Sequence, residues 1–327
     1  MTQYVLGVDG GGTKTDCALF AIDGHPVDFL QWGPVSHEHL DGGYEACERE
    51  ILLMLRTLLE INKILPQQIV SAVFGIAGVD TSYQKKKITQ MIAKIALPNF
   101  IVCNDGFLGI KAGTSNGRGI NVINGTGCSF QGINANGEMM QIGGQSVVMD
   151  DVAGGYIIGR QMIAMVHREL FLDGEKTALT PMLMHEAGVS SREELMDELV
   201  RRVGDKTMQI KHLSHLVFEA ATQKDAVSLR YLTAMGHHMA DYCKALIRSL
   251  SLYEEETIEI VLIGSAFLKA ADKTHIKSMQ EDIICDYPGA IFKPLEVRPV
   301  CGAVLWAFTD CGQLNPGIRE NVLQGIE

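Results

Sequence analysis

The stretch Leu6-Gly7-Val8-Asp9-Gly10-Gly11-Gly12-Thr13-Lys14-Thr15 decides the fold of this chain of 327 residues. The apolar, β-branched run 4–8 and the mostly apolar run 16–22 both have strand character, and a turn at Asp23-Gly24 ends the second run. The glycines therefore lie in the bend of a predicted β-hairpin. A Walker A loop and a dinucleotide-binding loop each lead into a helix, so this placement excludes both.

The same loop carries the groups that bind a phosphate chain. Glycines let backbone N–H groups approach an anion closely, and here they are Gly10-Gly11-Gly12. Asp9 stands before them, and Thr13 and Lys14 add a hydroxyl and an ammonium group after them. These are the parts that a magnesium–nucleotide site requires. The alternative at this point is an ordinary glycine-rich hairpin without a ligand.

A second hairpin of the same kind follows later in the chain. Residues 119–124 have strand character, Gly125-Thr126-Gly127 form a turn, residues 128–133 form a strand, and Asn136-Gly137 form a polar turn. This order repeats that of residues 4–24. Two such units predict an internal duplication, in which two facing lobes each offer one hairpin to the same phosphate chain.

Length, charge and cysteine content narrow the class of protein. The length predicts about two domains. The net charge is −11 and no run of Lys and Arg is longer than 85–87, so we expect no nucleic-acid partner and no anionic membrane partner. The chain starts directly in a strand and has no apolar run of about 20 residues, so we expect a cytoplasmic protein. The eight cysteines form no C-x-x-C pair, which favours reduced and buried thiols and disfavours a zinc or iron–sulfur site within one chain.

The rest of the chain alternates strands and helices. The pattern predicts a strand at 26–32, a polar loop at 33–39, a helix from 44 that ends before 66, a strand at 69–74, a helix at 84–95, a strand at 100–103, a helix at 153–172, a largely helical region at 176–253, a strand at 258–263 and a terminal helix from 299. Asp105 follows the strand 100–103 directly. Open α/β sheets bind ligands at this edge, although a carboxylate there can also cap the next helix.

Two further groups of polar residues are accounted for by local structure alone. Asp150 and Asp151 precede a predicted helix, where either could cap the helix and complement its dipole. The pairs 212/215 and 237/238 are histidines at helical positions. We disfavour a metal site at these pairs.

Taken together, these motifs resemble those of the sugar kinase, actin and heat-shock chaperone superfamily. Within it, the chain is most similar to the ATPase family that contains N-acetylglucosamine kinases and the activators of 2-hydroxyacyl-CoA dehydratases and of benzoyl-CoA reductase. Five motifs carry the resemblance over the whole chain: the two phosphate hairpins at 7–15 and 124–129, Asn104-Asp105, Gly264-Ser265 and Gly302-Ala303.

The resemblance implies a two-lobed α/β actin-like ATPase fold, made of duplicated ribonuclease H-like domains with a cleft between the lobes. Residues 1–118 together with about 300–327 would form the N-terminal lobe, which holds the first phosphate loop and the returning terminal helix. Residues 119–299 would form the C-terminal lobe, which holds the second phosphate loop, a helical insert and the adenosine loop.

The resemblance also implies an activity: transfer of the γ-phosphoryl group of ATP, with Mg²⁺, to a hydroxyl of a sugar, above all an amino sugar such as N-acetylglucosamine, in a homodimer. Asp105 would be the catalytic base, and Asp9 would hold Mg²⁺ directly or through water. The loop Gly10-Gly11-Gly12-Thr13-Lys14 and the loop Gly125-Thr126-Gly127 would cradle the phosphates, Gly264 and Ser265 would bind the adenosine, and the sugar would face Ser36, His37, Gly78, Asn104 and Asp151.

The loops around the sugar depart from the family pattern. The kinases usually have Asn where this chain has Ser36-His37. Their Gly-Gly-Trp-Gly stretch becomes Gly143-Gly144-Gln145-Ser146, and their Gly-Asp-Glu-Gly-Ser stretch becomes 150–154, which keeps Asp151 but not the glutamate. Two alternatives therefore stay open: an ATPase that activates a redox partner, with a cluster bridging two subunits, and a sugar or nucleotide sensor with little turnover.

Overall fold

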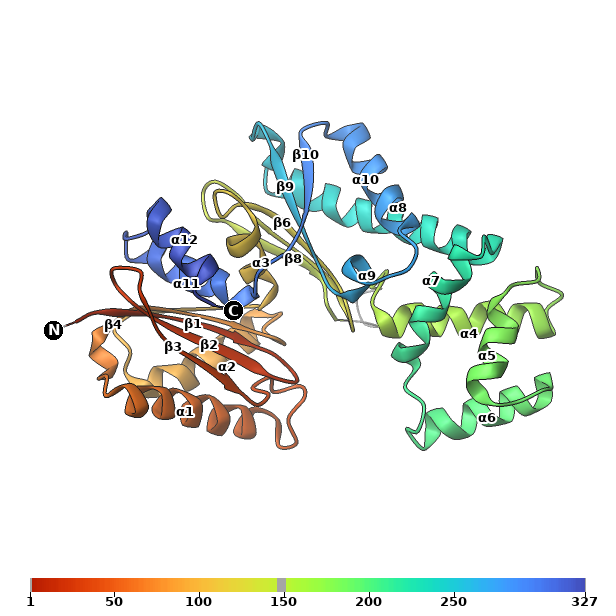
Figure 1. The fold of residues 1–327 in the computed structure, drawn as a ribbon, viewed down its shortest axis with the longest axis horizontal. Helices are drawn as coiled ribbons and strands as arrows, with labels where there is room; N and C mark the ends of the chain where they lie inside the picture. Colours follow the sequence, from red (N-terminus) through yellow and green to blue (C-terminus); the bar gives the residue numbers. More distant parts are fainter. Residues whose placement is uncertain (1, 146–150, 327) are drawn as a thin grey trace.

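Two five-stranded β-sheets form the framework of the computed structural model, which describes residues 2–145 and 151–326 (Figure 1). The strand order is β3-β2-β1-β4-β5 in the first sheet and β10-β9-β6-β7-β8 in the second. The strands are β1 (Tyr4–Gly10), β2 (Thr15–Ala21), β3 (Pro26–Trp32), β4 (Ile69–Ile76), β5 (Phe100–Cys103), β6 (Gly119–Asn124), β7 (Cys128–Ile133), β8 (Met139–Gly143), β9 (Ile258–Ile263) and β10 (Ala290–Pro294).

The two sheets have the same topology. In the first, β1 pairs antiparallel with β2 and parallel with β4, and these continue to β3 and β5. In the second, β6 pairs antiparallel with β7 and parallel with β9, and these continue to β8 and β10. The two glycine-rich turns close at corresponding places, after the pairs Gly10↔Thr15 and Asn124↔Cys128. The predicted internal duplication is therefore confirmed.

The described part of the chain contains twelve α-helices. Their ends lie within a few residues of the predicted ones, and the region 176–253 is largely helical as expected. None of these helices is both long and apolar enough to cross a membrane. The helices are α1 (Gly43–Asn62), α2 (Ser82–Ile92), α3 (Gly106–Gly113), α4 (Gly155–Phe171), α5 (Leu179–Ala187), α6 (Arg192–Gly204), α7 (Ser214–Thr222), α8 (Ala226–Ser249), α9 (Ser265–Leu268), α10 (Thr274–Asp286), α11 (Pro299–Asp310) and α12 (Pro316–Gln324).

The first sheet is buried on both faces because its strands alternate apolar side chains between two cores. Leu6 and Val8 of β1 point to one face, where they pack with α1 and α2. Val5 of β1 and Phe20 of β2 point to the other face, where they pack with α3, α11 and α12. The terminal helices therefore return to the first sheet, as Figure 1 shows.

The second sheet has one apolar face and one partly polar face. Ile120 and Val122 of β6 pack with α8, α10 and the helical region. Asn121 lies between them in sequence and points to the opposite face, together with Gln131 of β7, and both are fully buried. Helix α3 covers that face. Helices α4 to α7 extend away from this sheet (Figure 1).

Helix α3 lies between the two halves of the molecule and touches both through glycines. A Cβ atom on Gly109 would lie 2.8 Å from Oδ1 of Asn121, and one on Gly113 would lie 2.8 Å from a methyl group of Val261, so both glycines pack against the second sheet. On its other side, α3 packs against α11, where a Cβ on Gly302 would lie 2.0 Å from the backbone oxygen of Leu108. The absence of a side chain at Gly302 is what lets the two helices approach this closely. Because α3 begins directly after Asp105, its packing fixes that residue between the lobes.

Candidate functional site

The first glycine hairpin holds two neighbouring loops in place through its backbone. The N–H of Gly11 donates to the backbone oxygen of Lys14 at 2.9 Å, which closes the turn. The backbone oxygens of Gly10 and Gly11 accept hydrogen bonds from Ala77 at 2.8 Å and from Ser36 at 3.4 Å. The loops after β3 and β4, in which we expected residues that face the sugar, are therefore attached to the first phosphate hairpin.

The side chain of Lys14 does not point freely into solvent. Its ammonium group lies 3.0 Å from a carboxylate oxygen of Asp16, a buried residue that also lies 3.3 Å from the guanidinium group of Arg298 at the start of α11. Lys14 itself is 58% exposed. The ammonium group is thus held beside the loop by Asp16 and stays accessible to an anion. The sequence pattern missed the structural role of Asp16.

The second glycine hairpin holds the start of α4 in place through hydrogen bonds. The N–H of Gly125 donates to the oxygen of Gly127 at 3.0 Å. The N–H of Gly154, the N-cap residue of α4, donates to Oδ1 of Asn124 at 3.0 Å, and the N–H of Gly155 donates to the oxygen of Gly125 at 2.8 Å. The first turn of α4 is therefore fixed against this hairpin, and Thr126 and Gly127 are left exposed.

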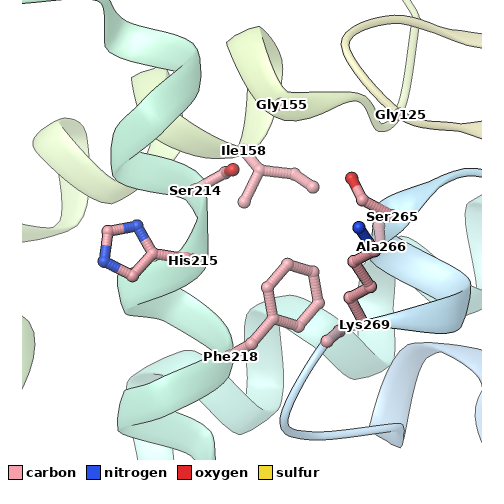
Figure 2. A pocket seen from close by; sticks show the side chains of 10 residues that line it. Gly125, Gly155, Ile158, Ser214, His215, Phe218, Ser265, Ala266 and Lys269 are labelled. Atoms are coloured by element: carbon pink, nitrogen blue, oxygen red, sulfur yellow. The ribbon is translucent and has the colours of Figure 1, made fainter.

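A pocket opens beside the second hairpin, and Gly125 and Ser265 lie in the same lining (Figure 2). Ile158 of α4 and Phe218 of α7 point into it, and Ala266 follows Ser265 on the opposite wall. A mostly apolar space next to a glycine-rich hairpin suits a nucleoside, with the hydroxyl groups of its lining available to the ribose. The complete lining is Gly125, Gly155, Ile158, Ser214, His215, Phe218, Ser265, Ala266, Lys269 and Ala270.

The sequence predicted only part of this pocket. Gly264 and Ser265 were expected at the adenosine, and the structure places them against the second hairpin. Ile158, Ser214 and Phe218 occupy ordinary positions of amphipathic helices. No local sequence pattern therefore identifies them as pocket residues. His215, which we considered as a metal ligand, lines the pocket with its ring turned away from the space (Figure 2). Within the described residues, no group of three or more His, Cys, Asp or Glu side chains is placed to hold a metal ion.

Asp9 and Asp105 come together from different elements. Asp9 lies near the end of β1 and Asp105 follows β5. Burial and the charges of Asp105 and Asp16 raise the pKa of Asp9 from 3.8 to about 8, against a smaller lowering by Lys14. Burial and the charge of Asp80 raise the pKa of Asp105 to about 6, although the N–H of Gly106 lowers it. Two carboxylates that repel each other in a partly exposed site suit both a divalent cation and a proton acceptor near neutral pH.

Asp105 occupies the N-cap position of α3 but makes no capping hydrogen bond within the described residues. The helix α3 therefore gains no side-chain cap from Asp105. Asp151 is likewise not the N-cap residue of α4, since Gly154 takes that place. Instead, Oδ1 of Asp151 accepts a hydrogen bond from the N–H of Gly144 at 3.0 Å. Asp150 and Ser146 lie outside the described residues.

The loop after β3 lies close to the loop after β4. A Cβ atom on Gly78 would lie 3.1 Å from the His37 ring and 3.0 Å from Cδ of Glu38, and Gly78 has a φ of +82°. The His37 ring stacks on Tyr44 with centroids 4.1 Å apart, and its Nδ1 atom is buried without a hydrogen-bond partner among the described residues. Burial lowers the pKa of His37, against the charges of Glu38 and Asp80, which raise it. Ser36 is fully buried, and its hydroxyl lies 3.3 Å from Nδ1 of His39.

Asp80 is a site residue that the sequence analysis did not select. Its Oδ1 atom accepts hydrogen bonds from Nδ2 of Asn104 at 2.9 Å and from Nε2 of Gln141 at 2.7 Å. Burial raises its pKa, Gln141 lowers it, and Glu38 and Asp151 raise it further. Asp80 therefore lies among the residues expected to face the sugar. Its position two residues after Gly78 was the available signal, but carboxylates are common in surface loops that bind no ligand.

The chain is similar to several known proteins. The sequence profile of the BadF/BadG/BcrA/BcrD ATPase family matches residues 6–307. N-acetyl-D-glucosamine kinase from Dictyostelium discoideum is 26% identical over 317 residues, which cover 93% of this chain and 98% of that protein. N-acetylmuramic acid/N-acetylglucosamine kinase from Clostridium acetobutylicum is 27% identical over 259 residues, 78% of this chain and 83% of that protein. The crystal structure of a proposed N-acetylglucosamine kinase from Chromobacterium violaceum shares the fold, with a TM-score of 0.64 at 18% identity over 93% of this chain and 98% of that one.

Proposed function

Because the chain belongs to the BadF/BadG/BcrA/BcrD ATPase family, we propose that it is an ATP-dependent kinase that transfers the γ-phosphoryl group to a hydroxyl of a sugar. The proposed substrate class is the amino sugars, N-acetylglucosamine first, because both curated relatives are named as kinases of such sugars. The match to the Dictyostelium protein covers nearly the whole of both chains. The family profile spans residues 6–307, a range that contains both glycine turns and Asp105.

One structural observation carries the proposal. Asp105 lies beside Asp9 of the first hairpin, close enough for its charge to raise the pKa of Asp9. The backbone oxygen of the next residue, Gly106, accepts a hydrogen bond from Nδ2 of Asn121 at 2.9 Å, and Asn121 belongs to the strand that leads into the second hairpin. These contacts support a potential base that would lie between the two glycine hairpins, which is the positioning that phosphoryl transfer needs.

The proposed nucleotide site runs from the pocket to the cleft. The adenosine would occupy the pocket beside Ser265, Phe218 and Ile158. The triphosphate would extend along the hairpin Gly125-Thr126-Gly127 toward the hairpin at 10–14, where Thr13 and Lys14 are exposed. Phosphate oxygens would then accept hydrogen bonds from backbone N–H groups of both hairpins.

Mg²⁺ fits the acidic side of this cleft. Kinase sites hold Mg²⁺ through one or two carboxylates and through phosphate oxygens, so a closed set of protein ligands is not required. Asp9 supplies such a carboxylate, directly or through water, and a cation beside it would offset its repulsion by Asp105 and Asp16. When bound, the ion would neutralise charge on the transferring phosphoryl group.

Asp105 would accept the proton of the attacking hydroxyl. The sugar would lie between His37, Gly78, Asn104 and Asp151. Ser36 would lie behind the residues that contact the sugar, because it is fully buried. We further propose a cytoplasmic homodimer, with lobes that comprise residues 1–118 plus about 300–327 and residues 119–299.

The experiment is a measurement of ADP release with a panel of hexoses, amino sugars and N-acetylated sugars, each with Mg²⁺-ATP. We expect at least one amino sugar to raise ADP release well above the rate with ATP alone, and mass spectrometry should find the sugar phosphate. ADP release that no sugar accelerates would contradict the kinase and would favour an ATPase with another partner.

A further inference from the structure

The carboxylate of Asp80 joins the two halves of the molecule. It follows β4 of the first sheet, and its Oδ1 atom accepts from Gln141 of β8, in the second sheet, at 2.7 Å. The same oxygen accepts from Asn104, the residue before Asp105, at 2.9 Å. A single carboxylate oxygen thus connects the second sheet to the segment that carries the proposed base.

We propose that Asp80 is a positioning residue, which links contact between the two lobes to the placement of Asp105 through Asn104. The inference rests on the proposed function for the role of Asp105, and it adds two residues, Asp80 and Gln141, to the working parts of the site.

The Asn104 side chain connects Asp80 to Gly106 because its amide nitrogen and its amide oxygen each make a hydrogen bond. Its Nδ2 group donates to Asp80, and its Oδ1 atom accepts from the N–H of Gly106 at 2.8 Å. On the far side of Gly106, Asn121 donates to the backbone oxygen at 2.9 Å. The peptide groups on both sides of Gly106 are therefore oriented by buried amide side chains. If the Asn104 amide rotated, the N–H of Gly106 would lose its partner and Asp105 would shift with it.

The backbone of Asp80 is anchored independently of its side chain. Its N–H donates to Oε1 of Gln84 at 3.0 Å, and the same oxygen accepts from the N–H of Thr81 at 2.8 Å in the capping box of α2. The loop therefore stays fixed to α2 when the carboxylate is removed. Substitutions of Asp80 should test the side chain and not the fold of the loop.

The facing side of the contact leaves room for Asp80. Gly144 follows β8 with a φ of +94°, and a Cβ atom there would lie 3.2 Å from Nε2 of Gln141 and 3.9 Å from Oδ1 of Asp80. The titratable groups around Asp80 are Glu38, Asp151 and Asp105, which are acidic, and His37. Since three of these four neighbours repel the carboxylate, the two amide donors are what hold Asp80 in this place.

When the cleft opens, the hydrogen bond between Asp80 and Gln141 must break because its two partners belong to different sheets. Asp80 then loses one of the two donors that hold it against its acidic neighbours, and Asn104 loses a fixed acceptor. Asp105 would be oriented fully only when the lobes are in contact, which would couple closure of the cleft to readiness for proton transfer.

The test compares Asp80→Ala, Asp80→Asn and Gln141→Leu with the wild type. An amide oxygen can still accept two hydrogen bonds, so Asp80→Asn keeps the contact and removes the charge. Gln324→Leu is the matched control, because it removes a bond of 3.1 Å between a glutamine amide and Glu320 on the exposed helix α12. Two quantities are measured: hydrogen exchange of the backbone amides at 104–108 in the full-length protein, and kcat with the best sugar from the panel.

We expect exchange at 104–108 to be faster in Asp80→Ala and in Gln141→Leu, with kcat lower by about 10 to 100-fold and nucleotide affinity within about twofold of the wild type. Asp80→Asn should restore most of kcat and the slow exchange, and the control should match the wild type. Wild-type exchange and a kcat within about threefold in both disrupting variants would overturn the proposal. If the wild type phosphorylates no sugar, the proposed function fails, while the exchange measurement still decides whether Asp80 and Gln141 order this segment.

Discussion

Gly264 lies so close to Asn124 that a Cβ atom on Gly264 would be 2.3 Å from the backbone oxygen of Asn124. Gly264 precedes α9 with a φ of +112°, and Asn124 is the last residue of β6 before the second hairpin. Two loops that are 140 positions apart in sequence thus lie in contact, and the pocket lined by Gly125 and Ser265 lies beside them. A side chain on Gly264 would push its loop away from the second glycine hairpin.

Gly264→Ala should therefore weaken binding of ATP and ADP by about tenfold or more and should lower stability by about 1 to 3 kcal/mol, since both backbone strain and a backbone clash result. Isothermal titration calorimetry and thermal melting measure the two effects. Gly312→Ala is a suitable control, because Gly312 also has a positive φ of +71° but nothing within 4 Å of its Cβ position. Equal loss of nucleotide affinity in both variants would mean that the contact with Asn124 is unimportant.

Asp105→Asn should reduce kcat by about 10² to 10⁴-fold, because the amide keeps the size of the side chain but cannot accept a proton. Nucleotide affinity should change little, since the pocket lies beside Ser265 and Phe218. The wild type should also lose turnover as the pH falls through about 6, the pKa of Asp105, because the base is then protonated. ADP release from pH 5 to pH 8 measures this. Wild-type turnover in the variant would identify Asp105 as structural and would make Asp151 the next candidate.

Asp9→Asn should stabilise the ligand-free protein at alkaline pH. The folded state keeps a proton on Asp9 up to a pKa of about 8, whereas the unfolded chain loses it near 3.8, so the wild type loses stability as the pH rises between these values. Asparagine does not titrate, and the melting temperature of the variant should exceed that of the wild type by a margin that widens from pH 5 to pH 9. Asp41→Asn at an exposed position is the control.

Nucleotide binding should depend less on Mg²⁺ in the Asp9→Asn variant than in the wild type. If Asp9 holds the ion, titrations with and without Mg²⁺ should give more similar ADP affinities in the variant than in the wild type. An unchanged Mg²⁺ dependence would place the ion elsewhere in the cleft, and a lower melting temperature at pH 9 would contradict the electrostatic argument for Asp9.

Phe218→Ala should weaken nucleotide binding by about 10 to 100-fold, because the ring forms a wall of the pocket and an aromatic side chain that stacks on a base contributes about 1 to 3 kcal/mol. The KM for the sugar should stay within about threefold, since Phe218 lies on α7, outside the loops proposed to face the sugar. Phe171→Ala, at a position 40% exposed at the end of α4, is the matched control. A larger effect on the sugar than on the nucleotide would argue against an adenosine site here.

The sequence by itself determined the two hairpins, the order of strands and helices and the place of Asp105, because glycine turns, apolar alternation and strand ends are local properties. Only the tertiary structure brought Phe218 and Ile158 to the pocket, paired Lys14 with Asp16 and Arg298, and set Asp80 between Asn104 and Gln141. In the pocket and around Asp80 the partners lie on different elements, and an amphipathic helix or a polar loop has the same local pattern wherever it packs. Contacts between distant elements depend on how the two sheets and α3 pack together, and no local window of the sequence contains that arrangement.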